Sequence, residues 1–143
     1  MPVIGAGALG RHHARILSGL DSVELVAVAE TNPVAGQAAA ESCGTRWIED
    51  YRELPGRVDA VSIVVPTFAH RSVAAEFLSR RIPVLVEKPL ASNLMQAEEL
   101  VELSERHGTI LQVGHIERFN PATAVAWKEC GTPKYIRVER VSP

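Results

Sequence analysis

Three features of the 143-residue sequence predict an α/β fold in which helices cover a doubly wound parallel sheet. Short apolar runs alternate with helical patterns along the chain, which is the order of a βαβα protein. Residues 58–65 form a largely apolar run, typical of a strand covered on both faces. Residues 5–10 read Gly-Ala-Gly-Ala-Leu-Gly and join a first apolar run to a helical pattern. In such a fold the loops after the strands converge on one crevice.

The elements are expected in a regular order along the chain. Pro33 fits the first turn of the second helix, where its missing N–H costs no hydrogen bond, and Ser92 is expected to cap the last long helix. The buried side of that last helix is expected to comprise Ala97, Leu100, Val101 and Leu103. Expected strands cover residues 3–4, 23–29, 45–47, 58–65, 83–86 and 110–113, and expected helices cover 11–20, 33–42, 69–80 and 92–107, with a helical turn at 50–54.

The Gly-x-Gly-x-x-Gly spacing after the first strand predicts a dinucleotide-binding turn. Gly5 permits the tight turn, Gly7 lets a pyrophosphate approach the backbone, and Gly10 lets the helix pack closely. Ala8 and Leu9 lie at the helix start, where free N–H groups and the positive end of the helix dipole attract phosphates. The alternative is an ordinary turn without a ligand.

A carboxylate stands at the end of the second expected strand. Glu30 follows the last motif glycine by 20 residues, and its oxygens can accept hydrogen bonds from both hydroxyls of an adenosine ribose. The same charge repels a 2′-phosphate, and residues 31–33 contain no arginine. The sequence therefore predicts NAD as the cofactor and disfavours NADP; the alternative is an exposed strand end.

The composition argues against several classes of function. A net charge of −2 with 22% charged residues leaves no basic stripe for nucleic acid. The longest apolar stretch, residues 60–65, is too short to span a bilayer, and no secretory signal is recognised. Cys43 and Cys130 fit no disulfide or metal-ligand pattern, so we expect a cytoplasmic protein with reduced thiols and no metal. A ligating or reactive thiol is the less favoured alternative.

The loop after residues 83–86 carries the strongest candidate for catalysis. Lys88 lies between Glu87, an expected cofactor contact, and Pro89. Its ammonium can hydrogen-bond a substrate hydroxyl or carbonyl and stabilise oxyanion character, or take part in proton transfer. The alternative is a solvated lysine in a loop.

Two more loops contribute candidates. After residues 58–65, Pro66 and Thr67 are expected to contact the cofactor, and His70 at the next helix start is a further cofactor candidate. The alternative is a helix-capping segment with a partly exposed histidine.

The loop after residues 110–113 offers donors for hydroxyls and phosphates, namely His115, Arg118 and Asn120, which we expect to bind substrate. A linker whose polar groups satisfy their own backbone is the alternative. His12 and His13, on the first helix, are expected to be surface or packing residues.

With these motifs in place, the sequence resembles the amino-terminal domain of the glucose–fructose oxidoreductase/inositol dehydrogenase (Gfo/Idh/MocA) family. The resemblance implies NAD(P)-dependent oxidation or reduction of a sugar, cyclitol or related hydroxyl, with Lys88 contacting the reacting substrate. Residues 115–121 are most similar to members that act on the 3-hydroxyl of UDP-N-acetylglucosamine. The matching pieces are residues 5–10 with His13 and Ala14, Glu30, Pro66-Thr67 with His70, Glu87-Lys88-Pro89, and residues 114–121.

The same resemblance implies a second domain built on an open sheet, and a homo-oligomer. We expect residues 1–121 to form a Rossmann domain and residues 122–143 to hold a connecting helix and the first strand, at 134–141, of that second domain. The family's later Asp-x-x-x-His segment does not occur in the sequence. We therefore expect this chain to bind dinucleotide, to turn over little or no substrate, and to self-associate through its last strand.

Two other functions use the same first domain. A non-catalytic NAD-sensing module would need the glycine motif and not Lys88. A two-domain reductase of an amino-acid precursor would share this domain and differ in the second one.

Overall fold

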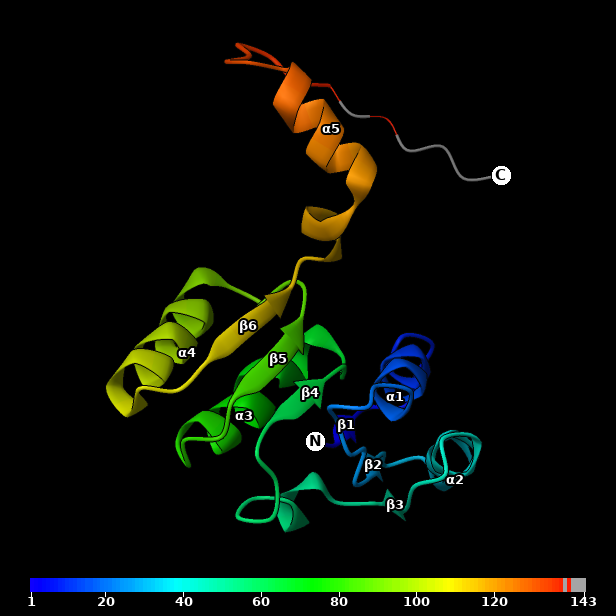
Figure 1. The fold of residues 1–143 in the computed structure, drawn as a ribbon. Coiled ribbons are helices and arrows are strands. Elements are labelled where there is room, and N and C mark those ends of the chain that lie inside the picture. Colours follow the sequence, from blue (N-terminus) through cyan, green and yellow to red (C-terminus); the bar gives the residue numbers. More distant parts are fainter. Residues whose placement is uncertain (138, 140–143) are drawn as a thin grey trace.

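A computed structural model describes residues 1–137 and 139 and places six parallel strands in one sheet with helices on both faces (Figure 1). The strand order is β3-β2-β1-β4-β5-β6, and every neighbouring pair is parallel. This is the doubly wound order of dinucleotide-binding folds, so the expected fold class is confirmed. The strands are β1 (Val3–Ile4), β2 (Val28–Ala29), β3 (Trp47–Ile48), β4 (Val61–Ile63), β5 (Val84–Glu87) and β6 (Leu111–Gly114). The α-helices are α1 (Gly10–Ser18), α2 (Pro33–Ser42), α3 (Thr67–Leu78), α4 (Leu94–His107) and α5 (Pro121–Glu129), and short 3₁₀ turns are η1 (Tyr51–Glu53) and η2 (Ile116–Phe119).

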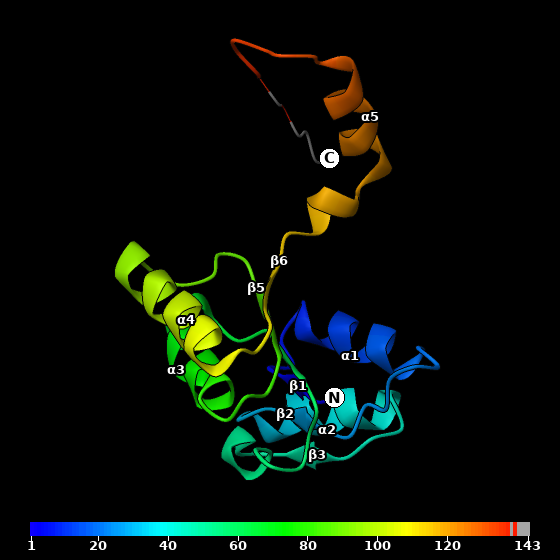
Figure 2. The same cartoon turned by 60° about the vertical axis from the view of Figure 1, so that its left-hand side comes forward.

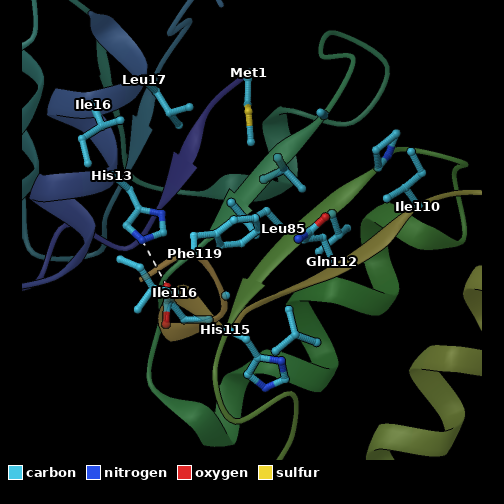
Figure 3. Close-up of a pocket in the computed structure, with 17 residues that line it drawn as sticks. Met1, His13, Ile16, Leu17, Leu85, Ile110, Gln112, His115, Ile116 and Phe119 are labelled. Carbon is cyan, nitrogen blue, oxygen red and sulfur yellow. Dashed lines mark ion pairs between the residues drawn. The ribbon is translucent and has the colours of Figure 1, made fainter. Parts of the chain in front are cut away.

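The helices cover the two halves of the sheet from opposite sides (Figure 2). Helices α1 and α2 lie over β1 to β3, whereas α3 and α4 lie over β4 to β6 on the other face. The α1-side face of β4 to β6 is left as an open groove of about 460 Å³ (Figure 3). Its lining includes Leu85 and Gln112 from the sheet, Ile16 and Leu17 from α1, and Phe119 from η2.

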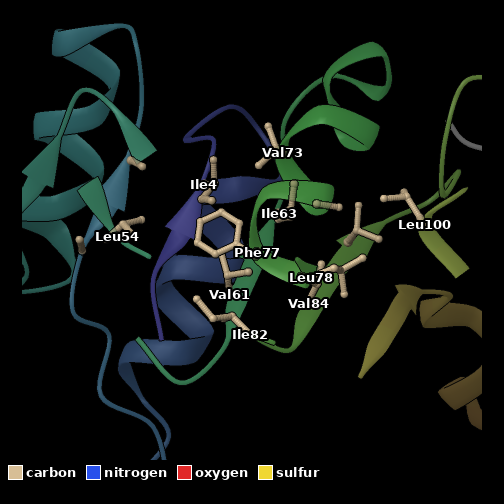
Figure 4. Close-up of a cluster of buried hydrophobic side chains, with 14 residues drawn as sticks. Ile4, Leu54, Val61, Ile63, Val73, Phe77, Leu78, Ile82, Val84 and Leu100 are labelled. Carbon is tan, nitrogen blue, oxygen red and sulfur yellow. The ribbon is translucent and has the colours of Figure 1, made fainter. Parts of the chain in front are cut away.

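The core consists of two apolar clusters, one on each face of the sheet. The larger cluster packs Phe77 and Leu78 of α3 against Val61, Ile63 and other strand residues (Figure 4). Strand β4 alternates, because Val61 and Ile63 face this cluster while Ser62 faces α1. Each large apolar side chain buried in this way stabilises the fold by about 1.5–3 kcal/mol. The smaller cluster comprises Val3, Ala6, Ala14, Leu25, Val28, Ala39 and Ala40.

Several element boundaries differ from the expected ones. Strand β2 covers only Val28–Ala29 of the expected residues 23–29, although residues 24, 26 and 27 also exchange backbone hydrogen bonds with residues 1–3. Helix α4 is capped by Asn93, whose Oδ1 accepts the Gln96 N–H at 3.0 Å, and not by Ser92. On the same helix Leu100 is buried as expected, but Val101 is 43% exposed.

The chain after β6 leaves the sheet. Helix α5 stands apart from it in both views, and all nine of its residues are exposed. The expected strand at 134–141 is not found in the described part, because residues 134–137 and 139 have no neighbouring strand to take up their N–H and C=O groups. Residues 138, 140 and 141 of that expectation lie outside the described residues. No helix in the described part is long and apolar enough to cross a bilayer.

Candidate functional site

A cleft of about 570 Å³ opens at the carboxyl edge of the sheet, beside the point where the strand order reverses between β1 and β4. Ligands bind at this switch point in doubly wound folds. The cleft brings together residues from the ends of β1, β2 and β4. Among those lining it are Gly5, Gly7, Ala8, Leu9, Glu30, Thr31, Pro66 and Phe68.

The three motif glycines are needed for different reasons. Gly5 has a φ of +95°, and a Cβ there would lie 2.5 Å from the Val64 carbonyl oxygen. A Cβ on Gly10 would lie 1.9 Å from the Gly5 carbonyl oxygen, so the start of α1 can pack on the turn only without a side chain. At Gly7, no protein atom lies within 4 Å of the Cβ position. The protein's own packing does not require a glycine there, and the approach of a pyrophosphate to Gly7 stays a prediction.

The turn offers hydrogen-bond donors for an anion. Within the described residues, the N–H groups of Gly7, Ala8 and Leu9 donate to no protein acceptor, and all three residues are exposed. They precede the first turn of α1, whose dipole is positive at this end. Free N–H groups beside a helix N-terminus fit the phosphates of a dinucleotide.

Glu30 is held at the cleft by backbone donors. Its Oε2 accepts the Ala6 N–H at 2.7 Å, and its Oε1 accepts the Asn32 N–H at 2.9 Å and the Thr31 hydroxyl at 3.3 Å. Partial burial works to raise the pKa of Glu30, but the N–H groups of Asn32 and Ala6 and the Thr31 hydroxyl outweigh it, so the pKa is lowered. The ionised carboxylate retains free lone pairs for ribose hydroxyls. The residues present therefore fit NAD.

The loop after β4 divides into exposed and buried parts. Pro66 lines the cleft, while Thr67 begins α3 beside it. His70 is 1% exposed, and its two ring nitrogens lie 2.8 Å from the Pro89 carbonyl oxygen and 2.9 Å from the Val65 carbonyl oxygen. The expectation of a cofactor contact, or of a partly exposed residue, is corrected: His70 ties α3 to the loops after β4 and β5.

Lys88 follows directly after β5 and is exposed. Within the described residues its ammonium forms no ion pair, so the charge is available to a ligand. The Lys88–Pro89 peptide bond is cis. The Lys88 N–H donates to Oε2 of Glu87 at 3.2 Å.

Glu87 also contacts the first helix. Its Oε1 lies 3.3 Å from Nε2 of His13 (Figure 3). Nδ1 of the same ring lies 2.9 Å from the Ser62 hydroxyl on β4. The side chains of His13 and Glu87 are only 18% and 13% exposed. His12 is exposed as expected, but His13 is neither a surface residue nor simple packing.

Three residues expected to bind substrate, His115, Arg118 and Asn120, lie in the segment after β6. Asn120 caps α5, since its Oδ1 accepts the Ala122 N–H at 3.0 Å and its Nδ2 donates to Glu117 at 2.8 Å. Both polar atoms of the Asn120 amide thus have local partners, and substrate binding by Asn120 stays a prediction. His115 and Arg118 are exposed on the same segment, and the His115 ring points away from Phe119 (Figure 3).

Sequence reasoning missed Phe68, Ser62 and Gly114. Phe68 is 79% exposed at the cleft, and an exposed aromatic residue directly after a strand-end loop was the available signal. Ser62 and Gly114 matter through contacts with residues far away in the sequence, for which no local signal exists.

Comparison with known proteins agrees with this geometry. A sequence model of an oxidoreductase family, described as an NAD-binding Rossmann fold, matches residues 1–115. UDP-N-acetylglucosamine 3-dehydrogenase of Acidithiobacillus ferrooxidans is 32% identical over 142 residues, which cover 99% of this chain and 45% of that protein. scyllo-Inositol 2-dehydrogenase (NAD(+)) of Bacillus subtilis is 35% identical over 147 residues, covering 94% and 42% of the two chains.

Solved structures give the same result. The Acidithiobacillus ferrooxidans enzyme superimposes with a TM-score of 0.83 at 32% identity, covering 91% of this chain and 41% of that chain. myo-Inositol 2-dehydrogenase from Lactobacillus plantarum has a TM-score of 0.83 at 27% identity, covering 89% and 39%. The chain thus spans less than half the length of these relatives.

Proposed function

Because the chain belongs to the Gfo/Idh/MocA oxidoreductase family as its NAD-binding Rossmann domain, we propose that it forms the cofactor half of a dehydrogenase acting on a hydroxyl carbon of a sugar or sugar nucleotide. A second domain would complete the substrate pocket. We call this chain joined to that second domain the two-domain protein. From its resemblance to the family, we propose that the two-domain protein is a cytoplasmic homo-oligomer. Its partner in the reaction is a small-molecule substrate.

The observation that carries the proposal is the position of Lys88. It is exposed, and its ammonium is unpaired within the described residues. Strand β5 lies two strands away from β1, and strands are spaced about 4.8 Å apart, which places Lys88 roughly 10 Å along the sheet edge from the glycine turn. A cation at this distance from the phosphate site suits the reacting end of an extended dinucleotide.

The residues of this chain have separate tasks in the proposed reaction. The N–H groups of Gly7, Ala8 and Leu9 would hold the pyrophosphate, and Glu30 would hold the ribose hydroxyls. NAD, when bound, supplies the acceptor for a hydride from the substrate carbon. Lys88 would donate a hydrogen bond to the substrate oxygen and stabilise its negative charge as the hydroxyl proton passes to a base of the second domain.

The substrate class rests on relatives of two kinds. The two relatives described above act on UDP-N-acetylglucosamine and on scyllo-inositol, which share a secondary hydroxyl on a six-membered ring. The sequence of residues 115–121 favours the nucleotide sugar, with the 3-hydroxyl as the reacting group. His115 and Arg118 are the substrate-side candidates that remain exposed.

The cofactor assignment is tested by calorimetric titration of this chain with NAD and, separately, with NADP. We expect tighter binding of NAD, and a loss of that preference in Glu30→Ala because the carboxylate that repels the 2′-phosphate is gone. Equal affinity of the wild type for both cofactors would contradict the role of Glu30.

The catalytic assignment is tested by hydride transfer in the two-domain protein, with UDP-N-acetylglucosamine and myo-inositol as the substrates tried. We expect Lys88→Ala to lower kcat by about 100-fold or more, because it removes the donor to the developing oxyanion. Arg106→Ala removes an exposed cation in the last turn of α4, at the other edge of the sheet, and is the control that should leave turnover unchanged. Undiminished hydride transfer in Lys88→Ala would contradict the catalytic role of Lys88. A wild-type protein that binds NAD and transfers no hydride with either substrate would favour the NAD-sensing alternative.

A further inference from the structure

We infer that His13 is a positioning residue for Lys88, acting through the carboxylate of Glu87. The inference rests on the proposed function, in which Lys88 meets the substrate. It assigns a role in the reaction to a histidine that lies on the helix after the glycine turn and outside the cofactor cleft.

The first step concerns Glu87, whose two oxygens have different partners. Oε2 accepts the backbone N–H of Lys88 at 3.2 Å, while Oε1 lies 3.3 Å from Nε2 of His13. At this distance the two groups form an ion pair when the imidazole is protonated, and Nε2 is the ring atom that faces the carboxylate. The carboxylate therefore joins the backbone at Lys88 to α1.

The second step concerns the anchor of the imidazole. Nδ1 of His13 lies 2.9 Å from the hydroxyl of Ser62, which is fully buried on β4. A hydroxyl can donate to a bare ring nitrogen or accept from a protonated one, so this bond persists in either form of the ring. The ring is thus fixed at both nitrogens, which sets the direction in which Nε2 meets Glu87.

The third step concerns the space for the carboxylate. Gly114 on β6 is the register partner of Glu87, and a Cβ at Gly114 would lie 2.5 Å from Oε1 and 2.8 Å from Cδ of Glu87. The glycine therefore leaves the volume that the carboxyl group fills. With Gly114 on one side and His13 on another, the Glu87 side chain has little freedom to turn away.

The consequence is a direct connection between the two halves of the site. His13 lies in the first turn of α1, the helix that starts at Gly10 and whose N-terminus faces the phosphate site. The network Ser62–His13–Glu87 ends at the Lys88 backbone. The helix that holds the cofactor thereby also fixes the loop that carries the proposed catalytic cation.

Two amide variants separate the bonds of His13. The amide of glutamine reaches the position of Nε2 and can keep the donor to Glu87, whereas the shorter asparagine reaches Nδ1 and keeps only the contact with Ser62. In the 143-residue chain, we expect the Lys88 backbone amide resonance to move in His13→Asn and to stay near the wild-type position in His13→Gln. His12→Asn, one residue away and exposed, is the control and should leave that resonance in place.

The inference would be overturned if the Lys88 resonance moved equally in both variants, or if it moved in neither of them. If His13→Asn does not fold, Ser62→Ala replaces it, because it frees the ring without touching Glu87. An unmoved Lys88 resonance in folded Ser62→Ala would then count against the network.

Turnover gives a second readout in the two-domain protein. His13→Asn should lower kcat by up to about 100-fold through misplacement of Lys88, with the KM for NAD unchanged, and His13→Gln should restore much of the rate. A parallel change in kcat and in NAD binding for both variants would indicate a merely structural role. Lys88→Ala shows which of the two proposals has failed. If Lys88→Ala is active, the proposed function is wrong. If Lys88→Ala is inactive and both His13 variants are fully active, only the positioning role of His13 is wrong.

Discussion

At the residue scale, hydrogen bonds hold the carboxylate of Glu30 at the cleft. The Glu30 carboxylate accepts two backbone N–H groups and one hydroxyl, and together they lower its pKa despite partial burial. Its partner Ala6 lies in the glycine turn, so the ribose-binding carboxylate and the phosphate-binding turn support each other before any ligand arrives.

This arrangement predicts a pH-dependent contribution to stability. Because the pKa in the folded state is below the ordinary value of 4.5, the carboxylate stabilises the fold above that pH, and the effect is lost as the pH falls through the lowered pKa. Glu30→Gln should lower the free energy of unfolding by roughly 1 kcal/mol at neutral pH, a value kept small by solvent exposure. Thermal unfolding of both proteins from about pH 7 to about pH 3 should show the difference shrinking. A constant difference would contradict this assignment.

Alanine substitutions at two glycines of the motif, Gly7 and Gly10, should have different effects. Gly10→Ala should destabilise the fold by about 1–3 kcal/mol, because its Cβ would collide with the Gly5 carbonyl oxygen. Gly7→Ala has free space around its Cβ and should leave unfolding unchanged, while NAD affinity falls about tenfold. Urea unfolding and calorimetry on both variants check the pair. Unchanged NAD affinity in Gly7→Ala would remove the ligand as the reason for this glycine.

For single residues, the sequence predicts those positions that are set by a fixed spacing along the chain. Gly5, Gly10 and Glu30 occupy the expected positions because a turn and a strand end are set by local geometry. His13 and His70 could not be placed in this way. Their partners, Ser62 and Pro89, come from other elements, and only the packing of helix on sheet brings each pair together.

The elements are fixed by partners as much as by propensity. Helix α2 has the expected bounds because Pro33 and the Asn32 cap define its start locally. Strands β2 and β4 are shorter than expected because apolar character marks burial, which the segments beside a strand share. The assignment of Ser92 as the cap of α4 failed because Ser92 and Asn93 are both good capping types, and the backbone decides which one turns into the helix.

The cap of α4 gives a matched test at this scale. Asn93→Ala should lower the free energy of unfolding by about 1 kcal/mol, since the Gln96 N–H loses its acceptor. Ser92→Ala should change stability by less than about 0.5 kcal/mol. Denaturant unfolding of the two variants measures both values. The reverse order would show that the helix begins one residue earlier.

For the whole molecule, the NAD-binding Rossmann fold was predictable because alternating patterns and crossover handedness leave few arrangements. The position of α5 was not, since its sequence is that of an ordinary helix. It buries none of its residues, and it stands apart from the sheet. The open groove under α1 likewise follows from which helices are present, and no single segment indicates it.

The exposed α5 predicts that residues 122–143 add little to the stability of this chain. A protein ending at residue 121 should unfold within a few degrees of the 143-residue chain and bind NAD equally well, because the described residues of the removed segment, 122–137 and 139, are all exposed. Differential scanning calorimetry and NAD titration of both proteins provide the comparison. Sedimentation of the two proteins also tests self-association through residues 134–141, which should disappear with the shorter chain.

The pairing of β1 with β4 sets the order in which this protein can assemble during synthesis. Val3 pairs with Ser62, so the central pair of the sheet cannot close until about 60 further residues have left the ribosome, which takes about 3 to 12 seconds at ordinary elongation rates. The glycine turn rests against Val64, which directly follows β4. The glycine turn is therefore made about 60 residues before the segment it rests against, and NAD cannot assist folding until that segment has emerged.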